Sequence, residues 1–254
     1  MRVEQRGEGI KYRRIWRELR QEIQSGRWKV GQQIPSEPEL SETFGVSRGT
    51  VRKAIEQLTN EGMLRKEQGR GTFVVSAMPR LRKSLDWLAS FTEQLREEGI
   101  KPSTEVLEAG LVPAGQASGR IIEGFGLSRT AEVVYIRRLR RGNDVPFAIQ
   151  TVYLQPERCP GILDEGVDLT RLFHLYAERY DTHIAFGDEI IRVAAASEEE
   201  AVLLEIAPGD PVVIRDRISA DQEGYPFEVL YSVDRGDRFE YRYNILGDST
   251  RLVR

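Results

Sequence analysis

The sequence predicts an α+β protein with two domains, a smaller helical one at the N-terminus and a larger one built on an antiparallel sheet. Apolar residues recur at helical spacing between Tyr12 and Leu58. From Thr104 onward, runs of strand-like residues come in pairs around turn residues, as in β-hairpins. The charge also changes between the halves, since residues 1–76 have 15 Lys and Arg against 10 Asp and Glu, and the remainder has 22 against 30.

The N-terminal part begins with a segment, residues 1–10, that we expect to be a loose arm because it has Gly7 and Gly9 and no apolar period. An amphipathic helix then covers Tyr12–Ser25 and ends at Gly26. Its apolar stripe indicates packing against the helices that follow.

Two further helices are predicted to cross at a tight turn. Ser36 is suited to cap the first, and Gly45 ends it because glycine adopts the left-handed conformation at low cost. Ser47 caps the second helix, which Gly62 stops. The apolar positions of this pair lie at helical spacing and are Leu40, Phe44, Val51, Ala54, Ile55 and Leu58.

Two β-prone runs follow, Met63–Lys66 and Thr72–Val75, joined by a glycine-containing tip. Two crossing helices and such a hairpin describe a winged helix-turn-helix, whose second helix enters the DNA major groove with its N-terminal residues near base edges. The candidate DNA-contacting residues are Ser36, Arg48, Gly49, Thr50, Arg52, Gly69, Arg70 and Gly71. The helix residues among them, Arg48 to Arg52, are expected on or near the open face.

The run from Tyr12 to Val75 resembles the DNA-binding domain of the GntR family of bacterial repressors. The matching pieces are PSEPEL (Pro35–Leu40), GVSRGTVRKAIEQL (Gly45–Leu58), EGML (Glu61–Leu64) and GRGTFV (Gly69–Val74). The family usually has an Arg that touches the DNA backbone where this chain has Pro38. The resemblance therefore implies one phosphate contact fewer and a greater share for Arg48, Arg52 and the wing.

From Leu85 the pattern becomes mixed. We expect consecutive hairpins with interspersed helices, which favours an antiparallel sheet covered by helices over a parallel βαβ arrangement. The expected helices are Asp86–Glu98, Ala117–Gly124, Leu169–Tyr180 and Glu198–Ile206. The expected strands are Thr104–Val112, Val133–Arg141, Phe147–Leu154, Ile184–Ala196, Val212–Ala220 and Phe227–Val233.

This second half, from Leu85 to Gly247, resembles the UTRA domain, the effector-binding domain of the HutC branch of the same family. The resemblance rests on SFT (Ser90–Thr92), RLR (Arg138–Arg140), VPFAIQTVYL (Val145–Leu154), GYPFEV (Gly224–Val229) and DRGDRF (Asp234–Phe239). It implies a chorismate-lyase-like fold that is used for binding. It also implies small effectors, such as sugar phosphates, organic acids or amino-acid breakdown products.

The residues themselves indicate an anion site. Strand alternation places Arg138 and Arg140 on one face, where two guanidinium groups repel each other unless an anion bridges them. Ser90 and Thr92 offer hydroxyl donors for the same anion. The alternatives are arginines at exposed strand ends, paired with the acidic body, and hydroxyls on an ordinary helix surface.

Glu228 interrupts an apolar run, so it can accept hydrogen bonds from a ligand or pair with Arg138 or Arg215. Gln150 stands where relatives often have Glu, and Asp234 where many have Tyr, which implies a ligand whose polar end differs from the one best known in the family. The candidate effector-binding residues are Ser90, Phe91, Thr92, Arg138, Arg140, Gln150, Glu228 and Asp234.

The expected organisation is a DNA-binding domain at residues 11–76, a linker at 77–84 and an effector-binding and dimerisation domain at 85–247. Neither an apolar run of about 18 residues nor a signal-peptide pattern occurs, so we expect a cytoplasmic protein. With the single Cys159 and two separate histidines, His174 and His183, no metal site or cofactor is expected, and the histidines are expected to be structural.

These features predict a homodimeric, ligand-responsive bacterial transcription factor, a repressor that binds a palindromic operator and is not an enzyme. One alternative is a lyase-like enzyme fused to a DNA-binding head, which would form product without DNA. Another is a DNA-binding protein with no effector, which would show weak sequence preference and no ligand-dependent stabilisation. The sequence leaves open the effector, the target genes, the sign of regulation and the effect of Pro38, Gln150 and Asp234.

Overall fold

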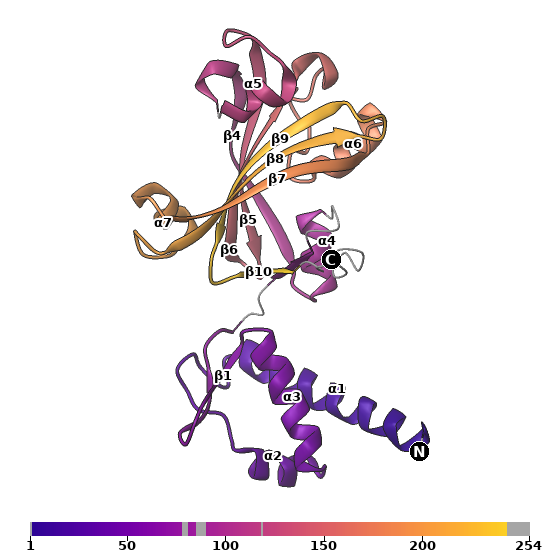
Figure 1. The fold of residues 1–254 in the computed structure, drawn as a ribbon, viewed down its shortest axis with the longest axis vertical. Coiled ribbons are helices and arrows are strands. Elements are labelled where there is room, and N and C mark those ends of the chain that lie inside the picture. The colour runs from indigo at the N-terminus through magenta and orange to yellow at the C-terminus, as the bar shows by residue number, and fades with distance from the viewer. Residues whose placement is uncertain (1, 78–80, 85–89, 118, 243–254) are drawn as a thin grey trace, which may run out of the picture. The chain divides into compact units, whose positions relative to one another are not determined.

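The protein is described by a computed structural model covering residues 2–77, 81–84, 90–117 and 119–242. The chain divides into two compact units, Met1–Arg80 and Leu81–Arg254, each with its own fold (Figure 1). The first contains α1 (Arg2–Gln24), α2 (Glu37–Phe44), α3 (Arg48–Asn60), β1 (Leu64–Glu67) and β2 (Gly71–Val74).

The helix boundaries in the first unit follow from local capping. Ser36 forms a capping box with Glu39, and Gly45 ends α2 with a φ of 62°. Ser47 caps α3, and its hydroxyl accepts a hydrogen bond from the backbone N–H of Thr50. Strands β1 and β2 pair antiparallel from Leu64 opposite Val74 to Glu67 opposite Gly71. The predicted winged helix-turn-helix is therefore confirmed.

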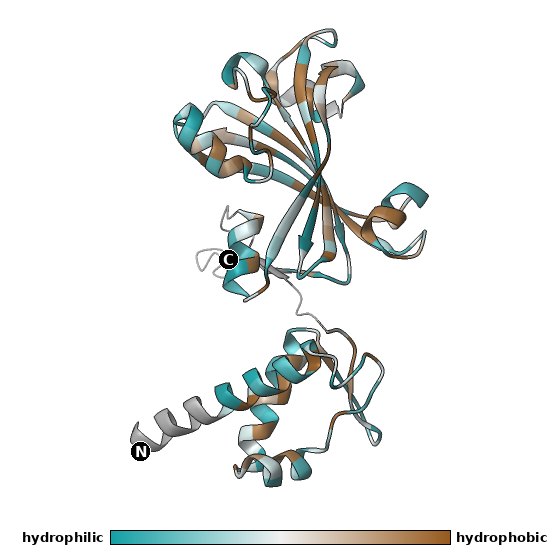
Figure 2. Ribbon diagram, turned by 180° about the vertical axis from the view of Figure 1, so that it is seen from behind, coloured by the Kyte–Doolittle hydropathy of each residue, from teal (hydrophilic) through white to brown (hydrophobic). Residues whose placement is uncertain are grey.

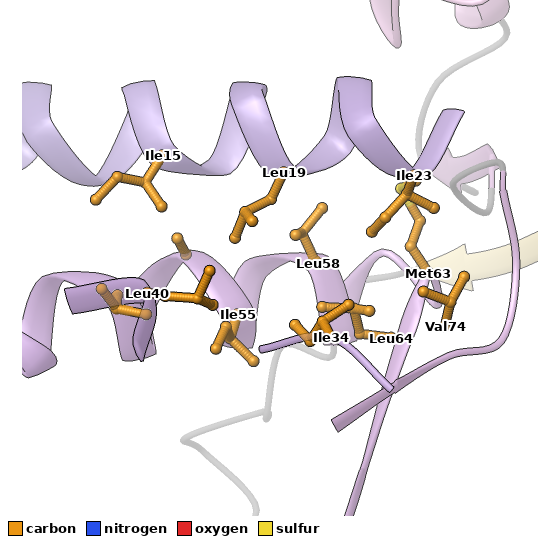
Figure 3. Packing of buried hydrophobic residues seen from close by; sticks show 12 residues of the cluster. Ile15, Leu19, Ile23, Ile34, Leu40, Ile55, Leu58, Met63, Leu64 and Val74 are labelled. Carbon is orange, nitrogen blue, oxygen red and sulfur yellow. The ribbon is translucent and has the colours of Figure 1, made fainter. Parts of the chain in front are cut away.

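One face of α1 closes the core of this unit. Ile15, Leu19 and Ile23 point from α1 toward Leu58 of α3 and Met63 beyond it (Figure 3). These side chains are at most 2% exposed. Burying apolar surface contributes about 25 cal/mol of stabilisation per Å². The burial of this stripe is therefore the main reason that α1 packs on α3.

Helix α1 is longer than the sequence predicted, because the expected loose arm continues the helix back to Arg2. The arm is rich in Arg, Glu and Gln, which are good helix formers. Gly7 and Gly9 each cost roughly 1 kcal/mol relative to Ala, which does not stop a helix by itself.

The second unit is organised around a six-stranded sheet with the order β4-β5-β6-β9-β8-β7, antiparallel at every pairing. Its strands are β4 (Pro102–Pro113), β5 (Glu132–Gly142), β6 (Val145–Leu154), β7 (Ile184–Ala195), β8 (Pro211–Asp221) and β9 (Pro226–Arg235). Its helices are α4 (Phe91–Glu97), α5 (Gly119–Phe125), α6 (Leu172–Tyr180) and α7 (Glu198–Leu204), with single 3₁₀ turns η1 (Ala114–Gln116) and η2 (Pro156–Arg158). The expected α+β class with an antiparallel sheet is confirmed.

Alternate residues of a strand point to opposite faces of a sheet. Helices cover both faces of this one. On one face Val134 and Ile136 pack against α6 through Leu172 and Tyr176. On the other face one apolar cluster involves α7 and a second involves Ile121 of α5. Hydrophobic and hydrophilic stretches both occur along the strands (Figure 2).

Two differences from the sequence prediction concern an additional strand pair and the start of α4. Leu81–Ser84, expected within the linker, forms strand β3 and pairs in parallel with β10 (Phe239–Arg242), a strand that was not anticipated. Helix α4 begins at Phe91, because Ser90 caps it by accepting a hydrogen bond from the Glu93 N–H at 3.2 Å. Asp86, where the sequence predicted the helix to begin, lies outside the described residues.

Candidate functional site

The recognition helix α3 presents an exposed, basic N-terminal half. Arg48, Gly49 and Arg52 are exposed, as predicted, and so is Lys53. Thr50 differs from the expectation, because it is 4% exposed and its hydroxyl lies 2.8 Å from that of Ser47. Thr50 lies one and two turns before the buried Ala54 and Leu58, which explains why it faces inward.

Glu37 connects the recognition helix to the wing. Arg52 Nε and Nη2 donate to Glu37 Oε2 at 3.1 and 3.0 Å, and Lys66 Nζ donates to Oε1 at 2.8 Å. Hydrogen bonds from Arg52 and then Lys66 lower the pKa of Glu37. Sequence reasoning missed this residue, since no periodicity links a carboxylate on α2 to cations on α3 and β1.

The wing tip is shaped by two glycines with positive φ, 73° at Gly69 and 121° at Gly71. Arg70 between them is exposed, pairs with Glu67 at 2.6 Å and stacks over Phe73. The Ser36 hydroxyl is 2.6 Å from Glu39 Oε2, so this candidate contact is already engaged in the helix cap.

The second unit contains a cavity of about 630 Å³ bordered by α4, α6, β7 and the neighbouring face of the sheet. The structure brings together there almost the whole effector set proposed from the sequence: Ser90, Phe91, Thr92, Arg138, Arg140, Gln150 and Glu228. Asp234 does not line the cavity.

Arg138 and Arg140 are 4% and 5% exposed, yet neither forms an ion pair with a carboxylate within the described residues. Arg140 donates to Gln150 Oε1 at 3.1 Å and to Thr92 Oγ1 at 3.0 Å, and Arg138 donates to the Leu169 carbonyl at 3.4 Å. Among the described residues, the buried Nε of Arg138 and that of Arg140 have no hydrogen-bond partner.

This environment disfavours the charged form of both groups. Loss of hydration lowers the pKa of Arg138, and the same loss, joined by repulsion from Arg138, lowers the pKa of Arg140 well below its usual value. Guanidinium remains charged in proteins, so the site holds two buried positive charges that no carboxylate of the described residues neutralises, although Arg140 also lies 4.8 Å from the centre of the Phe91 ring. A carboxylate or phosphate bound between the two forks would satisfy them.

Glu228 is not paired with Arg138 or Arg215, the two alternatives considered from the sequence. It is 1% exposed, accepts a hydrogen bond from Tyr176 Oη at 2.9 Å, and pairs with Arg217 at 3.3 Å. Arg217 also lines the cavity, and the sequence analysis missed it. It lies two positions from Arg215 on β8, as Arg138 lies two positions from Arg140 on β5.

Asp234 instead supports the wall of the cavity. It is fully buried and accepts hydrogen bonds from Arg215 at 2.7 Å and Tyr241 at 2.8 Å. Arg215 also pairs with Glu189 at 3.0 Å, and both of these residues line the cavity. Asp234 thus holds Arg215 in place from behind the cavity wall.

Both histidines lie at the cavity, although the sequence suggested purely structural roles. His174 is on the side of α6 away from the buried Leu172 and Tyr176, with its Nε2 2.9 Å from Glu178 Oε1. His183 precedes β7 and is exposed.

Among the residues that the structure describes, no cluster of His, Cys, Asp and Glu is suited to a metal ion. No described helix is long and apolar enough to cross a membrane.

A basic winged helix-turn-helix and a separate unit with an arginine-lined cavity define the class of DNA-binding regulators controlled by a ligand. Comparison with known families agrees. Residues 11–74 match the bacterial regulatory proteins of the gntR family, and residues 97–240 match the UTRA domain. The chain belongs to the GntR family of bacterial transcriptional regulators and has a UTRA domain.

Similar proteins cover nearly the whole chain. The HTH-type transcriptional repressor NagR of Bacillus subtilis is 34% identical over 91% of this chain and 92% of its own. A probable fructoselysine utilization operon transcriptional repressor of Escherichia coli is 29% identical over 89% and 91%. The crystal structure of PhnF from Mycobacterium smegmatis superimposes with a TM-score of 0.76 at 25% identity, covering 92% of this chain and 99% of PhnF. The first two of these proteins are named as transcriptional repressors, in agreement with the GntR and UTRA matches, so the chain is a transcriptional regulator and not an enzyme.

Proposed function

We propose that this protein is a repressor of the HutC branch whose operator binding is controlled by an anionic metabolite in the cavity. Two similar proteins are themselves named as repressors. The observation that supports the anionic effector is the pair of buried guanidinium groups, Arg138 and Arg140, which have no carboxylate partner in the part of the chain that the structure describes. Thr92 and Gln150 complete a donor-rich end of the cavity.

We assign DNA binding to residues 11–76 and effector binding with dimerisation to residues 85–247. The linker, residues 77–84, would transmit the effect of the ligand to the DNA-binding domain. The DNA contacts are Ser36, Arg48, Gly49, Thr50, Arg52, Gly69, Arg70 and Gly71. For Thr50 and Ser36 the contact would come through the backbone, since the first side chain is buried and the second is bonded to Glu39. A homodimer suits a palindromic operator, because half-sites mirror the two-fold symmetry of the protein. The protein works in the cytoplasm, where a bacterial chromosome lies.

Regulation requires that the effector bind unequally to the DNA-competent and DNA-incompetent states. Only this difference in affinity can shift operator binding, and such coupling is typically about 1–3 kcal/mol. Ser90 and Thr92 lie at the start of α4, so an anion at Arg140 contacts the first helix after residues 77–84.

The test is the double substitution Arg138→Ala and Arg140→Ala in the full chain. Inorganic phosphate, citrate and glucose 6-phosphate serve as probes in a thermal-shift titration, because a ligand that binds the folded state raises its melting temperature. We expect stabilisation of the wild type by at least one probe, loss of that response in the double variant, and unchanged affinity for a DNA duplex selected in vitro. An equal response in both proteins would reject the anion site.

A further inference from the structure

A carboxylate lies beside the DNA-reading residues of the first unit. Glu37, the first residue of α2, pairs with Arg52 of the recognition helix and with Lys66 of the wing. Proteins bind DNA phosphates through Lys and Arg, and a carboxylate among these cations repels the phosphates. Glu37 therefore weakens DNA binding in general, and its contacts indicate a compensating role.

The pair with Arg52 is not needed to hold α2 against α3. Leu40 of α2 and Val51 and Ile55 of α3 are at most 3% exposed and belong to one apolar cluster. Their burial joins the two helices. The side chain of Arg52 is 57% exposed, and an ion pair with such an exposed partner adds little stability.

The pair does fix the position of the guanidinium group. Arg52 Nε and Nη2 both donate to Glu37 Oε2, at 3.1 and 3.0 Å. Lys66 Nζ donates to the other oxygen, Oε1, at 2.8 Å, so the carboxylate cannot turn away without losing a partner. One edge of the guanidinium group of Arg52 is thus occupied. The opposite edge, which contains Nη1, forms no hydrogen bond with the described residues.

The free edge of Arg52 has the shape that reads guanine. Two N–H groups of an arginine fork fit O6 and N7 of guanine in the major groove, which is the commonest specific contact between proteins and DNA. Arg52 lies about one helical turn beyond Arg48 in the exposed N-terminal half of α3, the part of a recognition helix that approaches base edges.

We propose that Glu37 is a positioning residue that directs the free edge of Arg52 to a guanine of the operator. The proposal rests on the DNA contact assigned to Arg52 and goes beyond it. An arginine that is already ordered loses less conformational freedom on binding. It is also held away from the phosphates, which carry no sequence information directly. Glu37 thus lowers the affinity for any DNA and raises the preference for the operator.

The first test compares two substitutions that remove one negative charge each from α2. In fluorescence anisotropy, Glu37→Gln should bind an in vitro-selected duplex roughly 2- to 10-fold more weakly, the effect of ordering one long side chain, and a scrambled duplex at least as tightly as the wild type. Glu42→Gln, at an exposed position of the same helix, is the matched control and should change both affinities alike. Melting followed by circular dichroism establishes that each variant is folded, since an acidic residue in the first turn also stabilises α2.

The second test identifies the base. Each guanine of the selected duplex is replaced in turn by 7-deazaguanine, which lacks the N7 acceptor. Arg52→Ala should become insensitive to this replacement at one guanine. Glu37→Gln should lose part of its sensitivity at that guanine and keep it at any guanine that Arg48→Ala assigns to Arg48. Lys66→Met releases Oε1 of Glu37 without changing α2, so it should reduce the sensitivity at the same guanine.

The outcomes separate the positioning role from the contact itself. Equal effects of Glu37→Gln and Glu42→Gln on the two affinities, or an undiminished effect of 7-deazaguanine in Glu37→Gln, would overturn the positioning role and leave the DNA contact of Arg52 intact. An Arg52→Ala variant that stays sensitive at every guanine would overturn both.

Discussion

Replacing Arg140 by methionine is expected to stabilise the ligand-free protein while abolishing its response to anions. Methionine keeps the length and flexibility of the arginine stem and removes the charge. Arg140 is 5% exposed, and its polar partners among the described residues are the neutral groups of Gln150 and Thr92. Its loss also removes the repulsion that acts on Arg138.

The expected magnitude is a balance of two effects. Burying a charge without a counter-ion lowers the stability of the folded state by several kcal/mol. The substitution removes this penalty. It also leaves Gln150 Oε1 without a donor, at a cost of about 1–3 kcal/mol, whereas Thr92 is only partly buried and can turn to water. A net gain of about 1–2 kcal/mol raises the melting temperature by about 2–8 °C for a unit of this size.

The assay is scanning calorimetry of the full chain in a buffer without phosphate or sulfate, repeated with added phosphate. Arg217→Met is the matched control, because Arg217 also lines the cavity but pairs with Glu228, which is 1% exposed. That substitution leaves a buried carboxylate without its counter-ion and should lower the stability by about 3–5 kcal/mol. A lower melting temperature for Arg140→Met than for the wild type, or an undiminished response to phosphate, would refute the reasoning.

Two predictions concern the DNA interface. Arg52→Ala should lower the affinity for an in vitro-selected duplex roughly 10- to 100-fold, as for the loss of a well-placed base or phosphate contact, and fluorescence anisotropy that shows wild-type affinity in the folded variant would contradict this. Gly69→Val should weaken DNA binding and leave the phosphate thermal shift unchanged, because a β-branched residue strains a backbone with a φ of 73°; an identical footprint at identical affinity would count against a role for the wing.

Local structure followed from the sequence wherever a few neighbouring residues determine it. Ser36, Gly45 and Ser47 set the ends of α2 and α3 through caps that involve residues at most four positions away. The β5–β6 hairpin likewise turns at Asn143 and Asp144, which both adopt positive φ. Strand alternation was sufficient to place Arg138 and Arg140 on one face of the sheet.

The partners of these residues were decided by the tertiary structure. Arg52 meets Glu37 only because α2 and α3 cross, and Glu228 meets Arg217 only because β9 pairs with β8. The sequence allowed Glu228 to bind Arg138 or Arg215 equally well, and it did not distinguish Asp234, which supports Arg215 from behind, from a residue that lines the cavity.

The physical reason is the range of the signal. Periodicity and capping report on the nearest turn or strand pair, whereas β6 pairs with β9 across two other strands and two helices of sequence. β3 likewise pairs with β10 from opposite ends of the second unit. The sequence by itself determined the class of most elements, but not of the N-terminal arm, β3 or β10, and it placed Arg138 and Arg140 on one face of the sheet. The fold decided which charges are neutralised, and it left Arg138 and Arg140 buried without a carboxylate partner among the described residues.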